Sequence, residues 1–180
     1  DQSGKIVWQT RIGKGGLLGG IQWGMAVDQR RVYAALSDIS FPPSSTAGGA
    51  LTPLPDVGGG LFALDIKSGH KIWNALPIPC GDRKNCSPAQ SAAISVIPGI
   101  VFSGSLDGHL RAYSTKDGKI IWDFDSEREY ETVNGLKARG GSMDAAGPVI
   151  ANGMLFVNSG YGYWGGAPGN VLLAFSLDGR

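Results

Sequence analysis

Few side chains in this 180-residue sequence could react or bind a metal by their type alone. Cys80 and Cys86 are its two cysteines, separated by the polar segment 81–85. We expect a disulfide on an exposed loop, which would stabilise the fold by about 2 kcal/mol and persist in an oxidising compartment. Free or metal-bound thiols remain the alternative, but a metal site would need more soft ligands than these cysteines and the distant His70 and His109 supply.

An acidic residue close to two glycines is a candidate for proton transfer. Asp144 follows Gly140 and Gly141 where an expected strand begins. Glycines in such a place allow a ligand to come close to the backbone, and a carboxylate there could accept the proton of a substrate hydroxyl. A solvated aspartate at a strand end would explain the same residues without chemistry, so both interpretations stay open.

The overall composition excludes several classes of partner. Sixteen Lys and Arg residues against fifteen Asp and Glu residues give a net charge of +1, which offers no electrostatic basis for binding nucleic acid or an anionic membrane surface. No stretch approaches the roughly 18 consecutive apolar residues of a membrane span, so we expect none. The 29 glycines and 10 prolines predict a chain with many turns.

A repeated segment organises the chain. Ser3–Trp8, Ser68–Trp73 and Asp117–Trp122 superpose as a Ser-Gly or Asp-Gly pair followed by a tryptophan. The last two belong to a longer pattern, AxDxxxGxxxW, with serine in place of aspartate in the second. A further copy begins at Leu173 and reaches Gly179 without a tryptophan. Repeats at such intervals are typical of stacked supersecondary units.

Each copy predicts a β-hairpin, because apolar residues alternate on both sides of a turn glycine. The tryptophan is too large to leave in water, so we expect it to pack against the neighbouring unit. No segment has the period of a helix. Further strands are expected between the hairpins, at residues 21–27, 31–36, 92–97, 100–104, 147–150 and 154–158.

Four strands in each unit indicate the blades of a β-propeller. The expected fold is therefore all-β: a single partial propeller over residues 1–180, with about three four-stranded blades. We place these blades approximately at residues 11–76, 77–125 and 126–180, with residues 1–10 as the last strand of a preceding blade. Propellers usually close with four to eight blades, so we expect the remaining blades to belong to a longer parent chain.

Long connections interrupt the blades at residues 38–58, 77–90, 125–142 and 160–169. Function in propellers usually lies where such loops meet at the mouth of the channel. The charged stretch Ser126–Glu131, with Lys137 and Arg139, is interpreted as a solvated loop and only secondarily as a docking surface for an electron-accepting protein.

The AxDxxxGxxxW pattern resembles the tryptophan-docking motif of the quinoprotein alcohol dehydrogenases, eight-bladed propellers that hold pyrroloquinoline quinone (PQQ) with calcium. The repeat alone is shared with scaffolding propellers. More specific are Gly19–Asp28, Pro88–Ala93, Gly140–Pro148, Asn158–Tyr161 and Gly169–Ser176, which are similar to the C-terminal part of the branch of this family that oxidises polyvinyl alcohol.

The resemblance implies roles for four residues. Trp23 corresponds to the tryptophan that stacks on PQQ, Asp38 to an oxygen ligand of calcium and Asn158 to the amide that hydrogen-bonds the quinone. A blade-packing tryptophan, a strand-end cap and a turn asparagine are the respective alternatives. The Trp-Asp pair that precedes the base in methanol-oxidising relatives is missing here, so Asp144 is either the catalytic base or an acid that lines the channel.

The resemblance also implies the activity of the parent protein. It would be a periplasmic or secreted bacterial enzyme that oxidises secondary hydroxyls, using PQQ and calcium as cofactors and cytochrome c as electron acceptor. We expect the 180-residue chain alone to be inactive, because three blades cannot enclose the cofactor. The alternatives are a scaffolding propeller that binds proteins through strand edges or loops, and a domain that binds glycans or peptides.

Overall fold

The computed structural model describes residues 3–16, 18–42 and 52–178, and this part of the chain folds almost entirely as strands. One short 3-10 helix, η2 (Tyr163–Gly165), is present in the described ranges. The all-β expectation is thus confirmed. The strands are β1 (Ala26–Val27), β2 (Arg31–Leu36), β3 (Gly60–Asp65), β4 (Lys71–Ala75), β5 (Ile94–Ile97), β6 (Ile100–Gly104), β7 (His109–Ser114), β8 (Ile120–Asp125), β9 (Glu129–Glu131), β10 (Lys137–Arg139), β11 (Val149–Ala151), β12 (Met154–Ser159) and β13 (Val171–Ser176).

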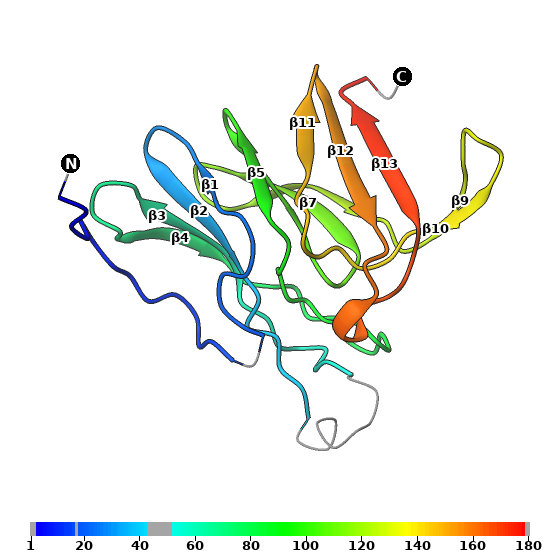
Figure 1. The fold of residues 1–180 in the computed structure, drawn as a ribbon, viewed down its shortest axis with the longest axis horizontal. Helices are drawn as coiled ribbons and strands as arrows, with labels where there is room; N and C mark the ends of the chain where they lie inside the picture. The colour runs from blue at the N-terminus through cyan, green and yellow to red at the C-terminus, as the bar shows by residue number, and fades with distance from the viewer. Residues whose placement is uncertain (1–2, 17, 43–51, 179–180) are drawn as a thin grey trace.

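Consecutive strands pair in antiparallel fashion into separate sheets. The first two sheets have four strands each, in the orders β1-β2-β3-β4 and β5-β6-β7-β8, and the next has three, β11-β12-β13. Figure 1 shows these sheets arranged like neighbouring sectors of a wheel. This arrangement confirms the partial propeller, although the last sheet holds three strands rather than four within the described residues.

Three details differ from the expected strands. Residues 3–10 form no strand, because a strand needs a hydrogen-bonded neighbour and no strand of the described residues pairs with them. The expected strand at 21–27 shortens to β1. The carbonyl of Gly24 instead accepts a hydrogen bond from the Ile94 N–H of the next sheet, at 3.2 Å. The charged loop contains an unexpected hairpin, β9–β10, which projects from the body of the molecule in Figure 1.

Trp8 and Trp73 each pack against the hairpin of the next repeat, as expected. Trp8 Nε1 donates to the Ile66 carbonyl at 2.9 Å, and Trp73 Nε1 donates to the Thr115 carbonyl at 3.0 Å. Each indole also lies over the turn glycine of the following hairpin, Gly69 or Gly118. A hydrogen bond and a ring contact therefore fix each tryptophan against the next blade.

Trp122 holds the corresponding place between the second and third sheets. Its ring meets Phe175 of β13 edge to face at 5.3 Å and stacks on Phe124 at 5.9 Å. It remains 36% exposed. The glycine of the last repeat, Gly179, lies outside the described residues, as do residues 43–51 of the long connection after β2.

We predict that Gly118→Ala destabilises the fold by about 2–4 kcal/mol. The glycine has φ +73°, where an L-residue is strained, and an added Cβ would lie 2.6 Å from a Trp73 ring carbon. Gly4→Ala is the matched control, because Gly4 has φ +64° but no atom within 4 Å of such a Cβ. Urea unfolding should show a much larger loss for Gly118→Ala, and equal losses would contradict the docking account.

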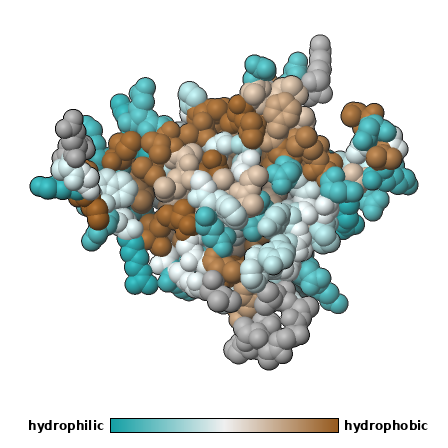
Figure 2. Space-filling view, in the orientation of Figure 1, coloured by the Kyte–Doolittle hydropathy of each residue, from teal (hydrophilic) through white to brown (hydrophobic). Residues whose placement is uncertain are grey.

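Two apolar clusters fill the spaces between the sheets. The first joins sheets one and two and includes Tyr33, Leu61 and Trp73. The second joins sheets two and three around Leu110 and Met143. Figure 2 shows further apolar residues along the upper part of the visible face, over the sheets, with hydrophilic residues on both flanks. Burial of side chains between blades is therefore the main force that holds the sectors together.

The cysteine loop has the expected disulfide, which joins Cys80 and Cys86. The Cys80 N–H also donates to the Pro55 carbonyl at 2.9 Å. The loop is thus fastened to the long connection that follows β2. In the described ranges no helix has the length and apolar character of a membrane span.

Candidate functional site

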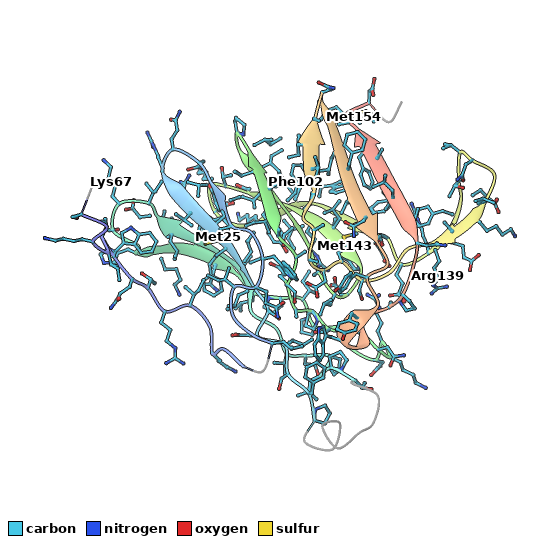
Figure 3. All side chains as sticks on the ribbon, viewed as in Figure 1. Met25, Lys67, Phe102, Arg139, Met143 and Met154 are labelled. Atoms are coloured by element: carbon cyan, nitrogen blue, oxygen red, sulfur yellow. A yellow bond between two sulfur atoms is a disulfide. The ribbon has the colours of Figure 1, made fainter. Side chains whose placement is uncertain are left out.

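Connections from all three large sheets meet at one end of the molecule. The segments that follow β2 and β12 emerge on the lower side in Figure 1, where η2 lies. Backbone hydrogen bonds join neighbouring segments there: the Leu106 N–H donates to the Ala89 carbonyl and the Met143 N–H to the Ser105 carbonyl, both at 3.0 Å. Figure 3 labels Met143 at the foot of the third sheet and Met154 at its opposite end. The convergence of loops expected from the sequence is present.

A pocket of about 210 Å³ opens among these segments. Its lining combines aromatic rings, an acid, two further polar side chains and a small apolar part. The lining residues are Leu18, Gln22, Trp23, Ile39, Ser91, Leu106, Asp144, Tyr161 and Trp164. Two of the four residues singled out in the sequence, Trp23 and Asp144, thus share one cavity.

Trp23 and Asp144 are in direct contact. The Trp23 Nε1–H donates to Asp144 Oδ1 at 3.1 Å, and the Ala145 N–H donates to the same oxygen at 2.7 Å. Trp23 is 50% exposed, whereas Asp144 is 6% exposed. Because the indole is so exposed and lies outside the docking register, it contributes little to packing between blades and offers an aromatic face to the pocket.

Burial raises the pKa of Asp144 above the usual aspartate value, and the hydrogen bonds from Ala145 and Trp23 offset part of this rise. A carboxylate with a raised pKa is a better general base near neutral pH than an ordinary aspartate. Both hydrogen bonds end on Oδ1, and no described residue donates to Oδ2. Oδ2 is therefore the atom that can accept a proton from a bound hydroxyl.

Two residues at this pocket have a strained backbone conformation. Ala145, next to Asp144, has φ +58°, and Trp164 has φ +56°. A residue other than glycine is uncommon in this region of φ and costs free energy that the surrounding structure must offset. Strained residues are common at ligand clamps and active sites, and their presence on two segments supports a functional pocket.

Asp38 lies beside the pocket rather than in its lining. Its carboxylate accepts hydrogen bonds from the backbone N–H groups of Lys14 at 2.8 Å and Gly15 at 3.0 Å. It therefore fastens the segment that leads to Trp23 onto the end of β2. In the described ranges no three His, Cys, Asp or Glu side chains gather in a way that could hold a metal ion. Its role as a calcium ligand stays a prediction.

Asn158 lies on β12, opposite Leu172 of β13, with its side chain exposed. It does not line the pocket. The next residue, Ser159, points to the other face and is buried, where its Oγ accepts the Gly141 N–H at 2.8 Å. Asn158 as a partner of the quinone also stays a prediction.

Sequence reasoning missed several lining residues, of which Tyr161 and Trp164 are the largest. Both lie in the connection 160–169, where aromatic residues alternate with glycines. Aromatic rings in a loop that cannot bury them were the available signal. Gln22 and Ser91 lie within segments already singled out, Gly19–Asp28 and Pro88–Ala93, but their residue types alone did not predict a place in a pocket.

Comparisons with known proteins agree with this architecture. The family model described as outer membrane protein assembly factor BamB (PQQ_2) matches residues 57–180. A polyvinylalcohol dehydrogenase of Pseudomonas sp is 43% identical over 100% of this chain and 28% of that protein. The enzyme of the same name from Sphingopyxis sp. (strain 113P3) is 45% identical over 98% of this chain and 28% of its own length.

A more distant relative is the 1-butanol dehydrogenase (cytochrome c) of Thauera butanivorans, 33% identical over 52% of this chain and 14% of that protein. Among solved structures, quinohemoprotein alcohol dehydrogenase ADHIIG from Pseudomonas putida HK5 superposes with a TM-score of 0.52 at 21% identity, covering 81% of this chain and 17% of that one. The chain spans 28% of the length of the two polyvinylalcohol dehydrogenases. It belongs to the PQQ_2 family of propeller proteins and is related to the quinoprotein alcohol dehydrogenases.

Proposed function

We propose that this chain forms part of a PQQ-dependent dehydrogenase that oxidises the secondary hydroxyls of polyvinyl alcohol and passes electrons to cytochrome c. The observation that carries the proposal is the contact between the exposed Trp23 indole and the buried Asp144 carboxylate in one pocket. Support also comes from the two polyvinylalcohol dehydrogenases that match nearly the whole chain. A periplasmic or secreted location is part of the proposal and agrees with the disulfide.

The residues of the pocket suit PQQ. A planar, polar quinone needs a flat aromatic face and groups that hydrogen-bond its oxygens. Trp23 supplies the face, and Gln22 and Ser91 supply an amide and a hydroxyl in the same cavity. The calcium that accompanies PQQ in the family would need ligands beyond the described residues, with Asp38 as one contributor.

In this proposal the protein performs the proton transfer. Asp144 Oδ2 accepts the proton of the substrate hydroxyl as the alcohol carbon is oxidised to a ketone. When bound, PQQ supplies the acceptor for the hydride that leaves this carbon. The indole N–H of Trp23 holds the Asp144 carboxylate in place through Oδ1. Leu18, Ile39 and Leu106 line the same pocket and would reduce the access of water to it.

The test is reconstitution of the full-length protein with PQQ and Ca²⁺. We expect polyvinyl alcohol and a short secondary alcohol to drive reduction of an artificial acceptor and of cytochrome c, with no reduction when PQQ is omitted. The isolated 180-residue chain should give no turnover, because its sheets do not close a ring. Absence of both an absorbance change with PQQ and acceptor reduction by the full-length protein would refute the proposal.

A scaffolding propeller is the second candidate, and the description of the matched family model as an assembly factor favours it. Such a protein would bind partners through its loops or strand edges and would have no use for a buried acid that contacts an exposed indole. If the full-length protein bound another protein stably and did not bind PQQ, this candidate would be supported instead.

A further inference from the structure

Three aromatic residues cluster in the connection between β12 and β13, and the proton transfer described above uses none of them. Tyr161 and Tyr163 meet edge to face with centroids 6.4 Å apart, and Tyr163 and Trp164 do so at 5.0 Å. Tyr161 and Trp164 line the pocket that contains Asp144. Tyr163 is 62% exposed, so the cluster extends from the pocket towards the outer surface.

This connection is fastened to the segment that carries Asp144. Ser142 accepts the Tyr161 N–H on its carbonyl at 2.9 Å and the Ala167 N–H on its Oγ at 2.8 Å. The Ser142 N–H in turn donates to the Ala167 carbonyl at 2.9 Å. Ser142 is fully buried, so the aromatic cluster is held in a fixed relation to the acid two residues further along the chain.

The rings have little role in holding the fold together. No residue of η2 is buried, and none of the three belongs to an apolar cluster between the sheets. Trp164 nevertheless keeps a left-handed backbone, with φ +56°, which costs free energy for a residue of its size. Two exposed tyrosines and a half-buried, strained tryptophan, held beside the carboxylate proposed as the base, are typical of a surface that binds a ligand.

We propose that Tyr161, Tyr163 and Trp164 form an aromatic subsite for the carbon backbone of a long polyol. The CH and CH₂ groups of such a chain would pack on the rings while one hydroxyl reaches Asp144. A short alcohol fills the reacting position but does not extend over the whole subsite. The rings would therefore favour polymeric over small alcohols. This inference rests on the proposed function, since it assumes that Asp144 marks the reacting end.

The test is Trp164→Gly in the full-length protein, with Trp164→Phe as the conservative variant and Leu136→Ala as a remote control. Glycine accepts φ +56° without strain, so the ring is removed while the backbone is kept. Leu136 is exposed in the turn between β9 and β10. We expect the KM for polyvinyl alcohol to rise about tenfold in Trp164→Gly, the size of one lost aromatic contact, and to rise much less for pentane-2,4-diol.

Trp164→Phe should have a KM for polyvinyl alcohol close to that of the wild type. Leu136→Ala should change the KM for neither alcohol. Equal changes for polymer and diol, or none, would overturn the subsite. A large loss of PQQ affinity in Trp164→Gly would overturn it too, because the ring would then belong to the cofactor site. If the wild type oxidises neither alcohol, the proposed function fails. Equilibrium binding of polyvinyl alcohol to PQQ-free protein then tests the subsite separately. The subsite proposal is wrong if Trp164→Gly binds the polymer as tightly as the wild type does.

Discussion

Replacing Asp144 with asparagine should lower alcohol-dependent turnover of the full-length, PQQ-loaded protein by a factor of about 10²–10⁴, the usual contribution of a general base. The amide oxygen can still accept the hydrogen bonds that Trp23 and Ala145 donate to Oδ1. The group at the position of Oδ2 can no longer take a proton from a hydroxyl. The measurement is kcat at saturating alcohol with a dye acceptor.

The pH profile provides the control for this variant. Because burial raises the pKa of Asp144, the base is protonated and inactive at low pH, and the wild-type rate should rise with pH through a value above that of an ordinary aspartate. This limb should vanish in Asp144→Asn, while PQQ binding is kept. A variant with wild-type kcat, or one that retains the acidic limb, would show that Asp144 is not the base.

Replacing Arg111 with methionine should lower the free energy of unfolding by about 3–5 kcal/mol, because the buried carboxylate of Asp107 would lose its charged partner. Arg111 and Asp107 are 3% and 4% exposed, and Arg111 Nη2 lies 2.7 Å from Asp107 Oδ2. The guanidinium also donates through Nε to Asp123 Oδ2 at 3.1 Å and through Nη1 to Ser105 Oγ at 2.9 Å. This network braces the turn between β6 and β7, which contributes Leu106 to the pocket. Urea unfolding measures the loss.

A second variant separates the ion pair from simple loss of packing. Arg111→Met combined with Asp107→Leu removes both charges, and replacement of a buried ion pair by apolar residues is often neutral. We expect the double variant to recover most of the stability lost by Arg111→Met alone. A single variant that loses less than about 1 kcal/mol would mean that the buried charge at Asp107 is satisfied in another way.

The repeat predicted the architecture because it contains both the turn residue of each hairpin and the tryptophan that packs on the next hairpin. A hairpin turn that needs positive φ selects glycine, and each such glycine in the β3–β4 and β7–β8 hairpins contacts the tryptophan of the preceding repeat, so both residue types recur in the copies. The strand expected at 21–27 failed because apolar character does not reveal which residues find a hydrogen-bonding partner. Residues 21–25 form no strand, and two of them, Gln22 and Trp23, line the pocket instead.

The sequence singled out Trp23 and Asp144, which share the pocket, but it could not predict that the two side chains meet. Trp23 and Asp144 lie 121 positions apart, and only the stacking of the sheets brings them together. The placement of Asp38 depends on a turn that offers it the N–H groups of Lys14 and Gly15, which sequence alone does not show. The β9–β10 hairpin, by contrast, had an overlooked signal in its Asn134-Gly135 turn.

The most direct test of the account is a structure of the full-length protein with PQQ bound. The account predicts that the quinone ring lies in this pocket, with one face against the Trp23 indole and the Asp144 carboxylate open to the position of an alcohol. PQQ bound at a different surface, with Trp23 and Asp144 remote from it, would contradict the account.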